Sequence, residues 1–272
     1  QAVGAADSLK TFMETPLTQL ERGEKTLNDN DLIGVEARDL VIKSPEGKVL
    51  AGPLNFSLPA GARVVLVGQS GSGKSSLLNT LLGFLPYEGS LKVNGAELRE
   101  LDAERWRRLL SWVGQNPQLP AATLRENVLL AWPEASDAQL RLALDKAWVS
   151  EFIALLPDGI HTAVGDQAGR LSVGQAQRIA VARALLVPCR LLLLDEPAAS
   201  LDAHSEQRVM QALTHASTEQ TTLLVTHQLE GLADWDAVWV MQDGQIIEQG
   251  DYATLARASG VFSALLAHRQ EE

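Results

Sequence analysis

The sequence predicts an α/β fold organised around a parallel β-sheet. This prediction depends on short, continuous apolar runs, each followed directly by glycine or polar residues. Strands that are buried on both faces of a parallel sheet have this composition, because neither face meets water. In open α/β sheets ligands bind beyond the carboxyl ends of the strands, so the residues after each run are candidates for a functional site. The runs are residues 64–67, 191–194 and 222–226.

The first run leads into a glycine-rich segment, which a helix-like stretch follows at residues 76–82. Strand, glycine-rich loop and helix in this order are the context that a phosphate-binding P-loop requires. Glycine lets backbone N–H groups approach a phosphate, and the N-terminus of a helix favours an anion. We therefore expect a nucleoside triphosphate here, with Lys74 near the β- and γ-phosphates and the Ser75 hydroxyl on Mg²⁺. The candidate nucleotide-binding residues are Gly68, Gln69, Ser70, Gly71, Ser72, Gly73, Lys74, Ser75 and Ser76.

Two carboxylates, Asp195 and Glu196, follow the second run. At the end of a buried strand, Asp195 is placed to hold Mg²⁺ directly or through water. Glu196 is placed to polarise a water molecule for attack on the γ-phosphate. The alternative is that the pair only caps a strand, and the P-loop elsewhere in the chain makes this interpretation the weaker one.

Three further motifs narrow the prediction. Residues 171–175 precede a helical run, residues 200–202 follow the two carboxylates, and His227 follows the third apolar run. Together with the P-loop and Gln115, these motifs resemble, in order and spacing, the nucleotide-binding domain of ABC transporters. The resemblance extends from about residue 33 to residue 270.

The resemblance implies a P-loop NTPase core of the RecA type, an antiparallel β subdomain and an α-helical subdomain at about residues 116–189. It implies an ATPase that uses ATP and Mg²⁺, and whose ATP is enclosed between the P-loop of one domain and the signature of a second. Glu196, His227, Gln115 and Lys74 would be catalytic, and Ser75, Gln115 and Asp195 would hold Mg²⁺. The residues facing the ATP of the second domain would be the signature residues Ser172, Val173, Gly174 and Gln175, and Asp202 would lie in the D-loop.

Other segments resemble ABC exporters in particular. Residues 116–128 and 162–167 are similar to the segment after the Q-loop and to the X-loop of exporters. The amphipathic stretch 1–13 is then expected to end the last transmembrane or connecting helix, with a linker at residues 14–32 and the ATPase domain at 33–270.

A closer resemblance, carried by residues 113–120 and 196–208, is to the CydDC-type heterodimeric exporters of bacteria, which are linked to cytochrome bd assembly. It implies a different chain as the second ATPase domain and a transmembrane domain outside this sequence. It also implies ATPase action at the cytoplasmic face of the bacterial inner membrane. The cargo would be a small thiol, cysteine or glutathione, or be related to haem.

Two positions depart from the family pattern. Ser44 stands where many exporters have a tyrosine that stacks on adenine, and Val173 stands where most signatures have glycine. Loss of the ring is expected to weaken nucleobase binding, by about 1–3 kcal/mol on the scale of aromatic–base stacking. The stiffer β-branched side chain at position 173 is expected to tune the approach of the signature to a phosphate rather than abolish it.

Composition limits the remaining alternatives. The formal net charge of −11 argues against nucleic acid as a partner. The single cysteine, Cys189, is expected to be a buried packing residue in a reducing compartment. An ABC importer ATPase, a DNA-repair or chromosome-structuring ATPase and a non-hydrolysing regulatory domain stay as alternatives. The exporter-like segments argue against an importer ATPase. The lack of sustained heptads argues against a DNA-repair or chromosome-structuring ATPase, and the presence of both Glu196 and His227 argues against a non-hydrolysing domain.

Overall fold

The computed structural model describes residues 27–28, 31–69, 71–165, 171–199, 201–216 and 219–269. These residues form two compact units. We call residues 27–110, 190–196 and 219–269 the sheet unit, and residues 111–189 and 197–216 the helical unit, in each case for the described residues only. The expected amphipathic stretch 1–13 lies outside the described residues, as does most of the expected linker at 14–32.

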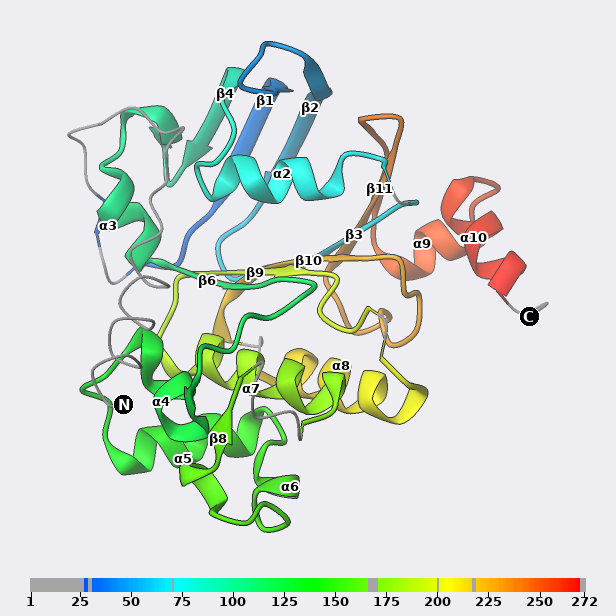
Figure 1. The fold of residues 1–272 in the computed structure, drawn as a ribbon. Coiled ribbons are helices and arrows are strands. Elements are labelled where there is room, and N and C mark those ends of the chain that lie inside the picture. Colours follow the sequence, from blue (N-terminus) through cyan, green and yellow to red (C-terminus); the bar gives the residue numbers. More distant parts are fainter. Residues whose placement is uncertain are drawn as a thin grey trace. The chain divides into compact units, whose positions relative to one another are not determined.

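The sheet unit contains an antiparallel sheet in the order β2-β1-β4-β5 (Figure 1). Its strands alternate between buried and exposed residues over much of their length, as expected where one face of a sheet packs on a core. This sheet is the antiparallel β subdomain that the sequence predicted. Its strands are β1 (Val35–Lys43), β2 (Val49–Leu58), β4 (Tyr87–Val93) and β5 (Ala96–Glu97).

The second sheet of this unit is mainly parallel. Its order is β12-β11-β3-β10-β9, and the next strand in the order is β6 (Leu110–Val113), through which the chain passes into the helical unit. β3, β9, β10 and β11 run parallel, and β12 pairs antiparallel with β11. Three of its buried strands, β3, β9 and β10, contain the three apolar runs. The bounds are β3 (Arg63–Val67), β9 (Leu191–Asp195), β10 (Thr221–Thr226), β11 (Ala237–Gln242) and β12 (Gln245–Gly250).

The register of this sheet places three strand ends at one edge. Thr226 of β10 lies opposite Val67 of β3, and Val225 lies opposite Asp195 of β9. Because these strands are parallel, the residues that follow them emerge on the same side. The residues concerned are Gly68, Glu196 and His227.

Helix α2 (Lys74–Leu81) lies between the two sheets and contacts β1, β2 and β9 (Figure 1). It buries Leu77, Leu78 and Leu81 in a core that the two sheets share. Trp106 closes this core and donates from its ring nitrogen to the Leu81 carbonyl oxygen at 2.8 Å. The remaining helices of the sheet unit are η1 (Leu98–Glu100), α3 (Ala103–Arg108), α9 (Tyr252–Arg257) and α10 (Val261–Arg269).

The helical unit is built around α7 (Val173–Leu186), which contacts α4, α5 and α8 (Figure 1). Side-chain capping boxes begin α4, α5 and α7, which explains where these helices start. A two-stranded ladder of β7 (Ala122–Thr123) and β8 (Ala163–Val164) completes the described part of the unit. The other elements are α4 (Leu124–Val128), η2 (Leu129–Ala131), α5 (Asp137–Lys146), α6 (Ser150–Ile153), η3 (Gly159–His161) and α8 (Ala203–Ala216).

Three observations bear on the sequence predictions. Cys189 is buried, with 2% of its surface exposed, as expected of a packing residue. The helical subdomain is expected at about residues 116–189, and the helical unit contains residues 197–216 as well, because α8 packs on α7 and α5. Within the described ranges no helix combines the length and apolar character that crossing a membrane requires.

Candidate active site

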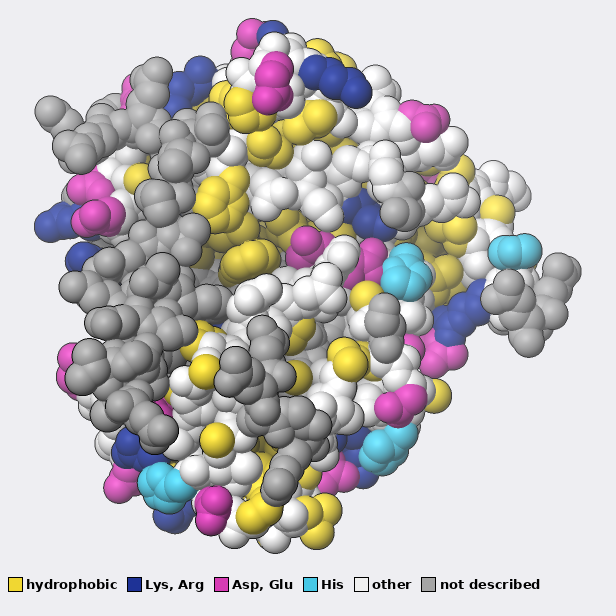
Figure 2. Space-filling view, in the orientation of Figure 1, with side chains coloured by type: hydrophobic (Ala, Val, Ile, Leu, Met, Phe, Trp, Pro, Cys, Tyr) yellow, Lys and Arg dark blue, Asp and Glu magenta, His cyan; other side chains and the backbone are white. Residues whose placement is uncertain are grey.

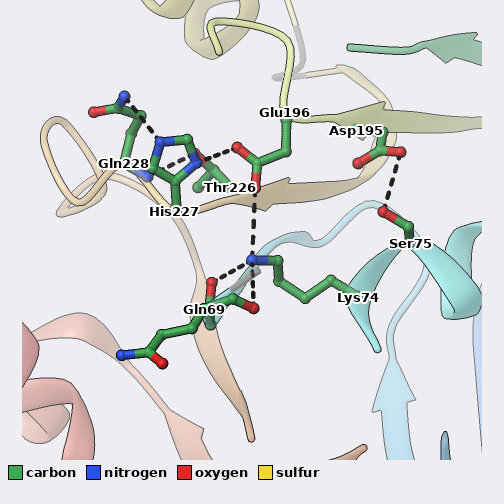
Figure 3. A network of polar contacts seen from close by, with 9 residues as sticks. Gln69, Lys74, Ser75, Asp195, Glu196, Thr226, His227 and Gln228 are labelled. Atoms are coloured by element: carbon green, nitrogen blue, oxygen red, sulfur yellow. Dashed lines mark hydrogen bonds and ion pairs between the residues drawn. The ribbon is translucent and has the colours of Figure 1, made fainter. Parts of the chain in front are cut away.

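Lys74 is the first residue of α2, and its ammonium group folds back over the loop that precedes the helix. Its Nζ donates to the carbonyl oxygens of Gly68 and Gln69, at 3.4 Å for the latter, and lies 3.5 Å from Glu196 Oε1 (Figure 3). Burial lowers the pKa of Lys74, and the nearby carboxylates of Glu196 and Asp195 oppose this effect. A buried cation held this way is a ready point charge for an anion at the loop.

Glu196 joins the lysine to the histidine at the neighbouring strand end. Its carboxylate lies between Lys74 Nζ on one side and His227 Nδ1, in hydrogen-bond contact, on the other (Figure 3). The Glu196 side chain is 9% exposed and that of His227 is 53% exposed. The Glu196 carboxylate is therefore largely shielded from bulk water, whereas the His227 ring is half exposed to solvent. This arrangement suits a base that holds a water molecule and a histidine that orients the base.

Ser75 and Asp195 form a second pair at the same edge. The Ser75 hydroxyl donates to Asp195 Oδ2 at 3.5 Å, a long contact between two oxygen atoms (Figure 3). A hydroxyl and one carboxylate fit Mg²⁺, which prefers oxygen ligands and takes few from the protein when substrate phosphates supply others. The donor set of the chain therefore matches the predicted metal.

The loop at residues 68–74, which we call the phosphate loop, has the features of an anion cradle. Gly71 and Gly73 have φ values of 81° and 103°, which glycine adopts without strain. The Ser72 hydroxyl is buried and has no hydrogen-bond partner among the described residues, so it is available to a ligand. Ser75 and Ser76 lie in the first turn of α2, and Ser70 lies outside the described residues.

The predicted signature residues begin α7 in the helical unit. Ser172 is the N-cap, where its Oγ accepts from the Gln175 backbone N–H at 3.1 Å, while the Gln175 side chain accepts from the Ser172 backbone at 3.0 Å. Val173 is the next residue and is 62% exposed. The side chain that departs from the family pattern therefore projects into solvent rather than into the helix packing.

Gly174 and Asp202 share a neighbour in this unit. A Cβ added at Gly174 would lie 2.6 Å from Ser205 Oγ, so only glycine fits there. Ser205 in turn donates to Asp202 from its backbone at 2.8 Å and from its hydroxyl at 3.0 Å. These hydrogen bonds hold the pKa of the Asp202 carboxyl below its usual value. Ser205 thus connects the signature helix to the predicted D-loop, a role the sequence did not suggest.

Gln115 is exposed and lies in the same unit as the signature. The preceding carbonyl, that of Gly114, accepts a hydrogen bond from the Gln177 side chain of α7 at 3.2 Å. A Cβ at Gly114 would lie 3.1 Å from the Trp112 ring, so the chain before Gln115 packs closely. The loop that carries Gln115 is therefore attached to the signature helix.

Ser44 is engaged in the turn between β1 and β2. Its hydroxyl accepts from the Lys48 backbone N–H at 3.0 Å, and its own N–H donates to the Lys48 carbonyl oxygen at 2.8 Å. A turn residue therefore occupies the position where many relatives are expected to carry a tyrosine.

Comparisons with known proteins identify the family of this chain. A family model described as ABC transporter matches residues 51–199. The Escherichia coli (strain K12) glutathione/L-cysteine transport system ATP-binding/permease protein CydD is 74% identical over 272 residues, which are 100% of this chain and 46% of that protein. The transport ATP-binding protein AarD of Providencia stuartii is 57% identical over 273 residues, again 100% of this chain and 46% of that protein.

Among solved structures, a bacterial Atm1-family ABC exporter with ATP bound matches with a TM-score of 0.84 and 28% identity. The match covers 100% of this chain and 47% of that one. The chain thus spans a little under half the length of these relatives. The family match, the relatives and the fold lead to one conclusion: the chain belongs to the ABC transporter family and is an ATP-binding and ATP-hydrolysing domain of that family.

Proposed function

We propose that this ATPase powers an exporter and that the residues around Lys74 and Glu196 carry out the hydrolysis. The observation that supports this most directly is the placement of the Glu196 carboxylate between Lys74 and His227. The sequence separates these residues widely, and the parallel sheet brings them together. A carboxylate so held is suited to accept a proton from an attacking water molecule.

The remaining roles follow from position. The phosphate loop binds the phosphates of ATP through its backbone N–H groups and through Lys74, which exchanges its contacts with the loop carbonyls for contacts with phosphate oxygens. His227 keeps the Glu196 carboxylate oriented. Ser75 and Asp195, with Gln115, would hold Mg²⁺, which supplies charge neutralisation at the phosphates. The ABC ATPase domain is proposed to span residues 33–270.

A second ABC ATPase domain completes the site in this proposal. Ser172, Val173, Gly174 and Gln175 would face the ATP bound by that domain, with Asp202 beside them. The second domain is proposed to belong to a different chain, because the resemblance is to heterodimeric exporters. On the face drawn in Figure 2, Lys and Arg side chains are interspersed with Asp and Glu side chains.

The transported substrate and the location are inferred from the relatives. Two relatives carry glutathione and L-cysteine transport in their names, and the most similar of them shares 74% of its residues with this chain over the matched length. We propose small thiols as the cargo, with the ATPase at the cytoplasmic face of the bacterial inner membrane. A transmembrane domain of the same transporter would contact the membrane.

Steady-state Mg-ATP hydrolysis at increasing concentrations of this chain tests the proposal. We expect ATP to bind, turnover by this chain alone to stay at the level of the Glu196→Gln variant, and turnover to rise when the second domain is added. In that mixture, Glu196→Gln should lower the rate by about 10²–10⁴, the usual loss on removing a catalytic base. Glu134→Gln, at an exposed position of the helical unit, is the matched control and should keep the rate.

Each contrary outcome removes a different part of the proposal. Turnover that rises with the concentration of this chain alone, and that Glu196→Gln abolishes, would replace the heterodimer by a homodimer. A rate in the mixture that Glu196→Gln leaves unchanged would remove Glu196 as the base. Absence of ATP binding by the wild-type chain would overturn the proposed nucleotide site.

A further inference from the structure

The turn between β11 and β12 lies directly against the phosphate loop. Gly244, the second residue of this turn, donates from its backbone N–H to the Ser72 carbonyl oxygen at 2.9 Å. Its own carbonyl oxygen accepts from the Gly52 N–H at 2.7 Å. The two peptide groups of one residue therefore connect the phosphate loop to strand β2 of the antiparallel sheet.

The packing around this turn leaves no room for side chains on the loop. A Cβ added at Gly68 would lie 2.4 Å from the Met241 carbonyl oxygen. One added at Gly73 would lie 3.0 Å from the Met241 side chain and 3.5 Å from the Gly244 Cα. Two glycines of the phosphate loop are therefore in contact with the β11–β12 hairpin, at both ends of the loop.

The turn itself requires glycine for two separate reasons. Asp243 and Gly244 have φ values of 50° and 77°, the left-handed pair that connects antiparallel strands through a two-residue turn. A Cβ at Gly244 would also lie 3.2 Å from the Ala51 Cα, closer than such contacts normally are. Any side chain here would displace the turn from β2 or from the loop.

We propose that Gly244 is a positioning residue for the nucleotide, an inference that rests on the proposed role of the phosphate loop. In a trans peptide the C=O and the next N–H point in opposite directions. Holding the Ser72 carbonyl oxygen on the Gly244 N–H therefore aims the Gly73 N–H away from the turn. An N–H with this orientation is one of the donors on which phosphate binding depends. The turn therefore keeps the Gly73 N–H available to a phosphate.

The chain contains a matched control for this inference. The turn between β4 and β5, Asn94–Gly95, has φ values of 48° and 81°, nearly the same as the Asp243–Gly244 turn. A Cβ added at Gly95 would meet nothing within 4 Å. Substitution at Gly95 therefore introduces the same left-handed backbone strain without crowding Ala51 or touching the phosphate loop.

The experiment compares Gly244→Ala with Gly95→Ala in the 272-residue chain, measuring the ATP dissociation constant by calorimetry and the melting temperature. We expect both variants to melt at lower temperature, because both strain a left-handed position. Only Gly244→Ala should weaken ATP binding, by about three- to tenfold, as expected when one hydrogen bond at the loop is disturbed. Unchanged affinity in Gly244→Ala, or equal weakening in both variants, would overturn the inference.

A second pair of variants keeps the test decisive if Gly244→Ala does not fold. Asparagine tolerates the left-handed conformation, so Gly244→Asn and Gly95→Asn reduce the strain and keep the crowding at Ala51. The same difference in ATP affinity is expected between them. The proposed function fails separately: a wild-type chain that binds no ATP would sink it, whereas wild-type binding with unaffected Gly244 variants sinks this inference alone.

Discussion

Glu196 is buried and has a left-handed backbone, with φ at 50°, which a residue with a long side chain rarely adopts. Its N–H donates to the Val225 carbonyl oxygen at 2.8 Å, so the adjacent strand holds this conformation in place. Such a residue costs about 1–3 kcal/mol and persists where the surroundings determine it. The conformation turns the carboxylate toward Lys74 and His227, which is what the proposed chemistry needs.

At this scale Asp202 gives a pH-dependent prediction. Hydrogen bonds from Ser205 hold its folded pKa below the unfolded value, so its contribution to stability is present above about pH 4 and is lost as pH falls through the folded pKa. We expect the difference in melting temperature between the wild type and Asp202→Asn to be constant above pH 5 and to shrink below pH 4. Thermal melts between pH 2.5 and 7 check this.

Asp251 provides the control for that prediction. It accepts from the Thr254 N–H at 2.8 Å and from the Thr254 hydroxyl at 2.9 Å, the same arrangement at the start of α9. Asp251→Asn should show the same pH dependence of stability but leave ATP turnover intact, whereas Asp202→Asn should also lower turnover. A pH-independent stability difference for Asp202→Asn would contradict the hydrogen bonds as the cause.

At the scale of elements, α7 organises the helical unit through side chains spread along its length. Ser172 caps it, Gln177 binds the chain before Gln115, and Arg178 pairs with Glu151 at 2.8 Å. Near its end Arg183 donates to the Asn127 carbonyl oxygen at 3.0 Å. One helix therefore holds both the signature and the segments around Gln115.

Arg183 is the contact of this helix whose loss should cost most stability. Burial lowers its pKa to about 10, so it stays charged at neutral pH, and it also donates to the Gln118 carbonyl oxygen at 3.1 Å. Arg183→Ala removes the donor of the partly buried Asn127 carbonyl and that of the Gln118 carbonyl, and it should lower the free energy of unfolding by about 2–4 kcal/mol. Urea unfolding measures the change.

The matched control is Arg141→Ala, at an exposed position of α5, which should change the free energy of unfolding by no more than about 0.5 kcal/mol. Arg183→Lys should recover part of the loss, because lysine keeps the charge without the planar fork. A loss at Arg183→Ala as small as that at Arg141→Ala would refute the anchoring role of Arg183.

At the scale of the whole molecule, each unit carries one half of a composite site in the proposed dimer. The sheet unit contributes the phosphate loop with Glu196 and His227, and the helical unit contributes the signature. Val173 enters the signature with an exposed β-branched side chain. In a heterodimer this residue is present at only one of the two ATP sites, so the sites should be unequal.

Replacing Val173 by glycine tests that inequality. We expect Val173→Gly to raise turnover of the mixture with the second domain by about fivefold, which corresponds to ~1 kcal/mol, because the smaller residue lets the signature approach a phosphate. ATP binding by this chain alone should not change. Leu142→Ala, another exposed apolar position of the helical unit, is the control and should leave turnover unaltered. No change in turnover with Val173→Gly would remove the idea of unequal sites.

Local sequence patterns were sufficient for much of the fold. The glycine-rich loop and the apolar runs correspond to the described loop and to β3, β9 and β10, and the helix-like stretch at 76–82 corresponds to most of α2, which ends at Leu81. These features can be read from residues that lie next to one another in the sequence. The apolar composition of each run indicates a strand that is buried on both faces, and the glycine-rich segment between a strand and a helix indicates the loop. The same local logic placed the candidate residues at the ends of strands.

The tertiary structure decided which of those residues meet. It placed β10 between β3 and β9 and set the Glu196 carboxylate between Lys74 and His227. It also brought the Gly244 N–H into a hydrogen bond with the Ser72 carbonyl oxygen. The Asp243–Gly244 pair is a turn signal in the sequence, but nothing local indicates what that turn contacts. Contacts between distant segments depend on strand order and close packing, and these are settled by the burial of the whole core rather than by any short stretch of chain.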